Sequence, residues 1–200
     1  RQTWAFMVGM AASSPIWWFY IFWVPDFLNK QFGLNLTQTS LPLVVIFFAA
    51  SFGGILGGWF SSALLGRGWS VNAARKTALL VCALTIAPVF ATPLVPATNV
   101  WWAVGLVTLA AAGHCGYAAN LFTLVSDTVP RYAVGSVVGI GGMAGSLAGM
   151  VFAQLVSRVL DATHNNYAVP FAIAASTYLI ALGVIHLLLP RLEPMTIARA

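Results

Sequence analysis

The chain has 200 residues, of which 6% are charged and 60% are hydrophobic, and its mean hydropathy is +0.89. A soluble domain is about 25% charged, and no soluble fold of this length has an interior large enough for so much apolar surface. The composition therefore excludes a soluble enzyme, a disordered chain and a nucleic-acid-binding domain. The net charge of +5 fits membrane orientation better than a nucleic-acid partner, because of where the basic residues lie.

Charges and turn-forming residues divide the chain into six apolar stretches. Each has about the 20 residues that cross a ~30 Å hydrocarbon core, and the alternating pattern of a β-barrel is absent from the sequence. The sequence predicts an all-α integral membrane fold, a bundle of six transmembrane helices. The predicted helices cover residues 4–29, 41–65, 77–94, 101–126, 132–158 and 167–189.

The first predicted helix carries Trp17, Tyr20 and Trp23 at helical spacing, framed by Pro15 and Pro25. Aromatic rings can line a sugar site, with hydroxyl groups bonding to the ligand, and interrupted helices near mid-membrane often mark binding sites. Aromatic stripes also pack between helices. The pattern leaves both interpretations open.

Glycine residues mark the second and fifth predicted helices. Gly-x-x-x-Gly spacing places small residues on one helix face and allows two backbones to approach closely. The glycines expected to pack in this way are Gly53, Gly57, Gly141, Gly145 and Gly149. The first and fourth helices share polar and aromatic residues, and the third and sixth are plainly apolar. This predicts two three-helix repeats of opposite topology, as in many secondary transporters.

The fourth predicted helix carries His114, Tyr117 and Asn120, which form a slanting stripe on one face. An asparagine is costly in lipid, so Asn120 should face protein or water. His114 lies near mid-membrane. It can bind substrate, exchange protons because its ordinary pKa is near neutrality, or remain neutral and bond to a neighbouring helix.

The basic residues are distributed unequally between the two ends of the predicted helices. Seven fall on the side of the amino terminus: Arg1, Arg67, Arg75, Lys76, Arg131, Arg191 and Arg199. Only Lys30 and Arg158 fall on the other side. Cytoplasmic loops carry the excess of Lys and Arg, so the distribution predicts that both termini are cytoplasmic.

Five of the charged residues are candidates for a cytoplasmic gate as well as for setting topology. Arg67, Arg75 and Lys76 lie between the second and third helices. Asp127 and Arg131 are four residues apart at the end of the fourth helix. They can pair with each other, pair with a neighbouring helix, or lie in a solvated turn.

The sequence offers little support for catalysis or for a cofactor. Cys82 and Cys115 lie in apolar runs and are interpreted as free thiols, and no metal-ligand spacing occurs, so neither a metal nor a cofactor is expected. A six-helix intramembrane protease is the alternative from a different class. It needs an activated serine on a Gly-framed turn, and no Gly-x-Ser-Gly frame exists. The missing initial Met indicates a fragment or a processed chain.

Four blocks of sequence together resemble the hexuronate transporters, which belong to the anion:cation symporter group of the major facilitator superfamily. The blocks are residues 14–33, residues 57–76, residues 119–130 and residues 133–145. The resemblance implies the C-terminal half of a twelve-helix transporter. It also implies that the substrate lies between this half and a missing N-terminal half, which holds the coupling carboxylates. Tyr20 and Asn120 match the substrate-contacting positions best, followed by Trp17 and His114. Where Ser62 stands, the superfamily often has an Asp.

The function implied by the resemblance is import of a hexuronate, such as glucuronate or galacturonate, across the bacterial inner membrane together with protons. The expected partners are thus a small organic anion, H⁺, the lipid bilayer and the other half of the protein. Another organic anion, such as an aldonate, glucarate or an aromatic acid, is the alternative within the family.

Overall fold

The computed structural model describes residues 1–193, which form six α-helices and one 3-10 helix. The elements are α1 (Gln2–Phe32), α2 (Leu36–Gly66), α3 (Val71–Ile86), η1 (Ala87–Leu94), α4 (Val100–Thr128), α5 (Arg131–Ala162) and α6 (Ala168–Leu188). No strand occurs within this part of the chain. Six segments are long and apolar enough to cross a membrane, with α3 and η1 together forming one of them. The predicted all-α membrane fold is confirmed.

Two helices begin earlier than the apolar pattern indicates, because polar residues cap them. The Asn35 side chain accepts from the backbone N–H of Gln38 at 2.9 Å, and the Gln38 side chain accepts from the backbone N–H of Asn35 at 3.0 Å. This reciprocal pair satisfies donors that are otherwise unpaired at a helix start, so α2 begins at Leu36 instead of residue 41. Ser70 caps α3 with a single hydrogen bond, which its side chain accepts from the backbone N–H of Ala73 at 3.2 Å, and α3 begins at Val71 instead of residue 77.

Prolines have different effects in different helices. Pro15 and Pro25 lie inside α1, which continues through both. After α3, the chain tightens into η1, which has Pro88 near its start and Pro93 inside it. Proline removes a backbone donor and clashes with the preceding turn, and short 3-10 segments are common at such helix ends. The third membrane segment therefore consists of an α-helix, α3, followed directly by a 3-10 helix, η1.

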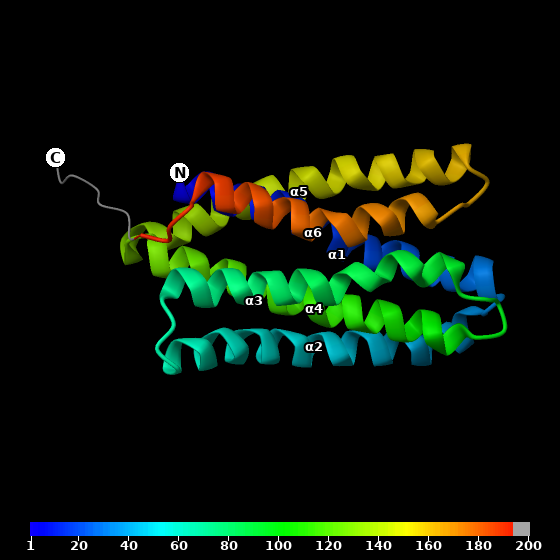
Figure 1. Cartoon of the computed structure of the whole chain (residues 1–200). Helices are drawn as coiled ribbons and strands as arrows, with labels where there is room; N and C mark the ends of the chain where they lie inside the picture. Colours follow the sequence, from blue (N-terminus) through cyan, green and yellow to red (C-terminus); the bar gives the residue numbers. More distant parts are fainter. Residues whose placement is uncertain (194–200) are drawn as a thin grey trace.

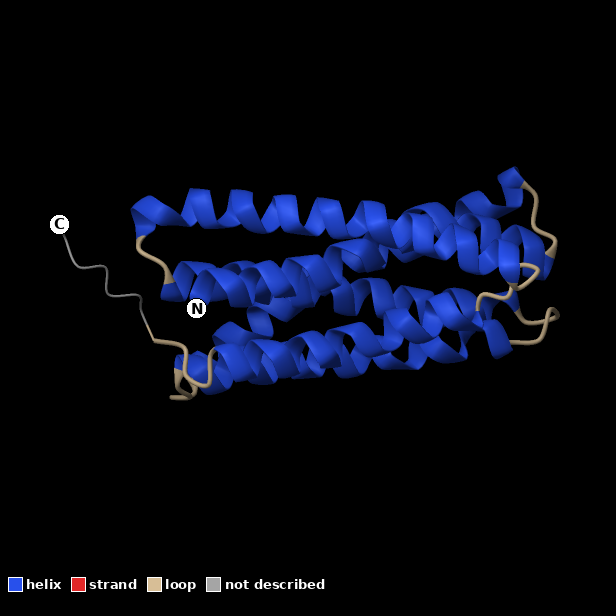
Figure 2. Ribbon diagram, turned by 90° about the horizontal axis from the view of Figure 1, so that it is seen from above, coloured by secondary structure: helices blue, strands red, loops and turns tan. Residues whose placement is uncertain are grey.

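All helices run along the long axis of the bundle (Figure 1), and the connecting loops lie at its two ends (Figure 2). The amino terminus and the end of α6 lie at the same end as the loop between α2 and α3, on the left of Figure 1. The loops after α1, η1 and α5 lie at the opposite end. Six of the seven basic residues expected on one side therefore lie at the end that holds the amino terminus and the end of α6, and Arg199 lies outside the described residues.

The most extensive helix contacts are between α2 and α4 and between α1 and α5. Glycines of α2 and α5 face the partner helix in both. A Cβ at Gly57 would collide with the backbone of Gly116 on α4, and one at Gly53 with the backbone of Ala112. The chain has two halves, α1–α3 and α4–α6, in which α1 corresponds to α4 and α2 corresponds to α5. The contact between α2 and α4 therefore corresponds to the contact between α5 and α1. The packing thus follows the repeat that the sequence suggests.

The glycines of α5 make the corresponding contacts with α1. A Cβ at Gly145 would lie 2.6 Å from Ser14 Oγ and 3.2 Å from the Met10 carbonyl oxygen. Gly141 faces the ring of Phe6, and Gly149 faces Trp18. The five glycines singled out by their spacing all lie against another helix.

Side-chain hydrogen bonds attach both ends of α6 to neighbouring helices. At the start of α6, the Tyr167 hydroxyl donates to Asp26 Oδ2 of α1, and Lys30 Nζ contacts both Asp26 Oδ2 and Asn165 Oδ1 at 2.8 Å. Burial, followed by the hydrogen bond to Asp26, raises the pKa of the Tyr167 phenol, which stays protonated and able to donate. At the other end, Lys76 Nζ donates to the carbonyl oxygens of Leu189 and Pro190 at 2.6 and 2.8 Å.

Candidate functional site

Three ring side chains from different helices meet at the middle of the bundle. His114 of α4 stacks on Trp17 of α1, with ring centroids 4.8 Å apart and an interplanar angle of 10°. Its Nδ1 lies 2.6 Å from the Tyr178 hydroxyl of α6. The three residues lie near the middle of helices Gln2–Phe32, Val100–Thr128 and Ala168–Leu188. The cluster therefore lies near mid-membrane depth.

Two buried tyrosine hydroxyls lie on the helices that form this cluster. Tyr117 packs edge-on against Tyr178, with centroids 5.1 Å apart. The hydroxyl groups of Tyr20 and Tyr117 are buried, and neither has a hydrogen-bond partner among the described residues. A buried hydroxyl without a partner is costly. Such groups are commonly explained by a ligand, by ordered water or by a functional role.

Of the two candidate tryptophans on α1, Trp17 belongs to the cluster, and Trp23 lies further toward the C-terminal end of the helix. Trp17 also contacts Phe47 of α2 edge-on at 5.8 Å, so its indole lies between α2 and the His114 ring. Trp23 stacks on Phe19 at 6.3 Å and is half-buried. Trp17 is thus in contact with a second candidate site residue, whereas Trp23 contacts other rings of its own helix.

Asn120 points toward α2 and makes a different set of contacts. Its Nδ2 donates to the carbonyl oxygens of Gly57 and Gly116, both at 2.9 Å. Its Oδ1 is buried and has no partner among the described residues. The amide nitrogen therefore joins α4 to α2 at the point where the two glycines bring the backbones together, which leaves only the carbonyl oxygen for another partner.

Sequence reasoning missed Tyr178, because α6 appeared to be a plain apolar helix. The available signal was a tyrosine in the middle of an apolar stretch. A buried tyrosine hydroxyl usually finds a hydrogen-bond partner, so such a residue predicts a polar group on a neighbouring helix. His114 is that group.

A second polar cluster lies at the end of the bundle that holds the amino terminus and the end of α6. Arg75 Nε of α3 lies 2.8 Å from Asp127 Oδ2 of α4, and Arg75 Nη1 donates to Ser61 Oγ of α2 at 2.6 Å. The arginine side chain is 9% exposed and that of the aspartate is 27% exposed. The ion pair joins α3 to α4, and the hydrogen bond from Arg75 to Ser61 adds α2.

The other charged candidates lie outside this cluster. Arg67 ends α2 and Arg131 begins α5, and both are exposed. Asp127 pairs with Arg75 and not with Arg131, although Arg131 is nearer in sequence. Lys76 binds the carbonyl end of α6, and its Nζ lies 3.2 Å from His186 Nδ1.

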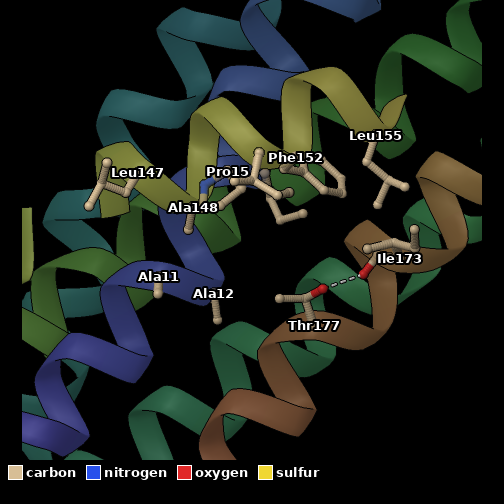
Figure 3. Close-up of a pocket in the computed structure, with 11 residues that line it drawn as sticks. Ala11, Ala12, Pro15, Leu147, Ala148, Phe152, Leu155, Ile173 and Thr177 are labelled. Atoms are coloured by element: carbon tan, nitrogen blue, oxygen red, sulfur yellow. Dashed lines mark hydrogen bonds between the residues drawn. The ribbon is translucent and has the colours of Figure 1, made fainter. Parts of the chain in front are cut away.

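Figure 3 shows a pocket where side chains of α1, α5 and α6 meet. Apolar residues such as Pro15, Phe152 and Ile173 line it. The hydroxyl of its one polar residue, Thr177, donates to the Ile173 carbonyl oxygen at 2.6 Å. The pocket therefore offers no free polar group to a charged or hydroxylated ligand. Within residues 1–193, no group of His, Cys, Asp and Glu has the arrangement of a metal site, and both cysteines are free.

The family model of the Major Facilitator Superfamily matches residues 1–153. The chain belongs to this superfamily. Its bundle has the architecture of one half of a twelve-helix superfamily transporter, and it is an integral membrane protein. The resemblance seen in the sequence is confirmed at this level.

Curated relatives are named as transporters of sugar acids. The D-galactonate transporter of Escherichia coli O6:H1 is 30% identical over 152 residues, which are 74% of this chain and 34% of that protein. The hexuronate transporter of Escherichia coli K12 is 27% identical over 161 residues, 80% of this chain and 37% of that protein. The probable galactarate/D-glucarate transporter GarP of the same strain is 28% identical over 164 residues, 82% of this chain and 36% of that protein.

The chain thus spans about a third of the length of the curated relatives that it matches. These relatives carry the names of transporters of organic anions and not of enzymes. The comparison therefore supports a transporter over the intramembrane protease.

Proposed function

We propose that this chain is the C-terminal half of a secondary transporter that imports a sugar acid, a hexuronate such as glucuronate or galacturonate, by alternating access. The proposed location is the bacterial inner membrane, with both ends of this segment in the cytoplasm. The observation that carries the proposal is the cluster of rings and partnerless polar atoms at mid-bundle. It occurs in a chain whose relatives are named as sugar-acid transporters.

The cluster has the chemistry that a sugar ring needs. Aromatic faces pack on the C–H faces of a pyranose, and hydroxyl and imidazole groups form hydrogen bonds with its hydroxyls. Trp17 supplies an aromatic face. Tyr20, His114 and Tyr117 supply polar atoms, and we include Trp23 and Asn120 as flanking contacts.

The substrate carboxylate needs a positive charge that this half does not supply at mid-depth. Among the described residues, Lys and Arg lie toward the ends of the helices or outside them. We therefore assign the cation for the carboxylate, and the carboxylates that couple transport to H⁺, to the other half of the protein.

The Arg75–Asp127 pair is proposed to stabilise one state of the alternating-access cycle. It lies at the end of the bundle assigned to the cytoplasm, where it joins α2, α3 and α4. A rearrangement of these helices would break it. Arg67, Lys76 and Arg131 are assigned mainly to orientation in the membrane.

The test uses full-length protein reconstituted into liposomes with a pH gradient, acidic outside. We expect uptake of labelled glucuronate or galacturonate that falls when an ionophore removes the gradient. Unlabelled galactonate, glucarate and an aromatic acid serve as competitors. Stronger competition by one of these would support the corresponding organic anion as substrate, and absence of uptake for every acid tested would refute the proposal.

The site is tested by combining Tyr20→Phe, His114→Gln and Asn120→Ala in the same protein. The matched control is Tyr132→Phe, because Tyr132 lies on α5 and is 77% exposed. We expect a loss of affinity in the combined variant alone. Unchanged affinity for every accepted acid would place the site elsewhere.

A further inference from the structure

We propose that Tyr178 is a positioning residue that holds His114 as a neutral imidazole with its proton on Nε2, so that this N–H is presented to the sugar acid. The inference rests on the proposed function for the identity of the ligand. The tautomer itself follows from geometry alone.

The His114 ring is restrained in two ways. Trp17 stacks on one face of the ring, and the Tyr178 hydroxyl lies 2.6 Å from Nδ1. The Tyr178 side chain is fully buried, and its ring packs edge-on against both His114 and Tyr117. The hydroxyl therefore has little freedom to leave Nδ1, and the imidazole has little freedom to turn.

The position of the single phenol proton decides the tautomer. Tyr178 Oη has two neighbours that can accept a proton, His114 Nδ1 at 2.6 Å and the Ser13 carbonyl oxygen at 3.5 Å. A distance of 2.6 Å is that of a strong hydrogen bond, whereas 3.5 Å is at the limit of one. The proton therefore belongs between Oη and Nδ1, with the tyrosine as donor. Nδ1 is then an acceptor, and the imidazole proton lies on Nε2.

The reverse arrangement leaves a donor poorly placed. If Nδ1 carried the proton, the Tyr178 oxygen would accept it, and the phenol proton would have only the Ser13 carbonyl at 3.5 Å. At that distance the Ser13 carbonyl oxygen is a poor acceptor for the phenol proton, and a buried donor without a good partner is costly. An imidazolium requires this same arrangement, because both of its nitrogens are donors.

The surroundings also favour a neutral ring. The two ion pairs present among residues 1–193 are Lys30–Asp26 and Arg75–Asp127, and both lie near helix ends, away from His114. The polar group that faces the imidazole from α6 is a phenol, and the group from α1 is an indole. A charged imidazole in the interior needs a counter-charge.

Nε2 is free to meet a ligand. Nε2 has no hydrogen-bond partner among the described residues. It is not one of the fully buried polar atoms without a partner, so part of its surface is accessible. The His114 residue as a whole is 7% exposed. A neutral N–H donor at this point suits a hydroxyl or carboxylate oxygen of a sugar acid. It also separates His114 from proton coupling, one of the roles that the sequence leaves open.

The first experiment reads the tautomer directly. Full-length protein is labelled with ¹⁵N-histidine in lipid nanodiscs, and the signal of His114 is identified by its loss in His114→Gln. We expect a pyridine-type signal for Nδ1 and a pyrrole-type signal for Nε2. Tyr178→Phe keeps the ring and removes the hydroxyl, so it should give a mixture of both tautomers. Tyr117→Phe is the spectral control, since the Tyr117 hydroxyl makes no hydrogen bond with His114, and it should leave the tautomer unchanged.

The second experiment links the tautomer to the ligand. A glutamine places an amide N–H near the position of Nε2, whereas an asparagine places one near Nδ1. We therefore expect His114→Gln to bind the transported acid more tightly than His114→Asn, and Tyr178→Phe to raise KM about three- to tenfold while kcat changes little.

The outcomes separate the two claims. A pyrrole-type Nδ1 in the unmodified protein, or a tautomer insensitive to Tyr178→Phe, would overturn the assignment whatever the protein transports. The expected tautomer in a protein that binds no sugar acid would leave the assignment intact and refute the proposed function. Tighter binding by His114→Asn would show that Nε2 is not the donor to the ligand.

Discussion

At the scale of single residues, the Arg75–Asp127 pair shows how burial makes a charge dependent on its partner. The guanidinium is almost fully enclosed, and it contacts both a carboxylate and the Ser61 hydroxyl. Removal of one partner of a buried pair leaves the other charge without compensation, which costs more than the pair contributes. The partial exposure of Asp127 allows some screening by water.

We expect Asp127→Asn to lower the free energy of unfolding by about 2–3 kcal/mol and to change the rate of transport. The exchanged double variant, Arg75→Asp with Asp127→Arg, should recover part of that stability. A double-mutant cycle by unfolding in detergent measures the coupling. Arg131→Gln is the control, because Arg131 is exposed and lies outside the pair. Strictly additive effects of the two substitutions would contradict an interaction between them.

Asn120 allows packing and binding to be separated. Its amide nitrogen donates to two backbone carbonyls, so Asn120→Ala should lower the free energy of unfolding by about 1–3 kcal/mol. Asn120→Asp keeps an acceptor and loses the donor, and it should lose at least as much stability. Thermal unfolding without sugar acid measures the stability of each variant, and the shift in the thermal midpoint when sugar acid is added measures binding. Unaltered stability in both variants would show that the amide does not join the helices.

At the scale of elements, the glycine-lined contacts between α2 and α4 and between α1 and α5 decide how the two repeats pack. Adjacent glycines on these helices differ sharply in their surroundings. A Cβ at Gly57 would collide with the Gly116 backbone, whereas one at Gly58 would meet nothing within 4 Å. The same contrast holds between Gly141 and Gly142 of α5.

We expect Gly57→Ala to destabilise the bundle strongly, because backbone atoms of α4 cannot move aside as a flexible side chain can. Gly58→Ala should be neutral or slightly stabilising, by about 0.5–1 kcal/mol, since alanine is the better helix former. The folded fraction after purification and the thermal midpoint in detergent test this pair. Equal behaviour of the two variants would mean that α2 does not pack on α4 through Gly57.

At the scale of the whole molecule, both termini of the described chain lie at one end of the bundle, together with most of the basic residues. The positive-inside rule predicts that this end faces the cytoplasm. Exposed positions at the two ends provide probes. Ala97 and Ala162 lie at one end, and Val71 and Tyr132 lie at the other.

Single cysteines at these positions, in full-length protein with Cys82 and Cys115 replaced by alanine, should react differently with an impermeant maleimide added to intact cells. We expect labelling at positions 97 and 162 and protection at 71 and 132 until the membrane is permeabilised. Labelling at 71 in intact cells would reverse the orientation. Labelling at all four positions would mean that the cells are leaky, which a cytoplasmic marker protein monitors.

The sequence by itself determined the class of this protein and the number of its membrane segments. Apolar length and the scarcity of charge are local properties, and a bilayer requires them of any spanning helix. Helix starts were less predictable, because the capping of α2 by Asn35 and Gln38 extends the helix into residues that look like a polar loop. The glycine spacing indicated which helices approach closely, since Gly-x-x-x-Gly gives a helix one smooth face.

Only the tertiary structure decided which partner each polar residue takes. Helical periodicity tells which residues share a face, but not which neighbouring helix that face meets. Asp127 was free to bond to Arg131 nearby, and it lies against Arg75, which is distant in sequence. His114, Tyr117 and Asn120 follow one stripe, yet the first two meet Tyr178 on α6 and the third meets the backbone of α2. A slanting stripe turns gradually around its helix, and in a tightly packed bundle that turn is enough to carry its two ends to different neighbours.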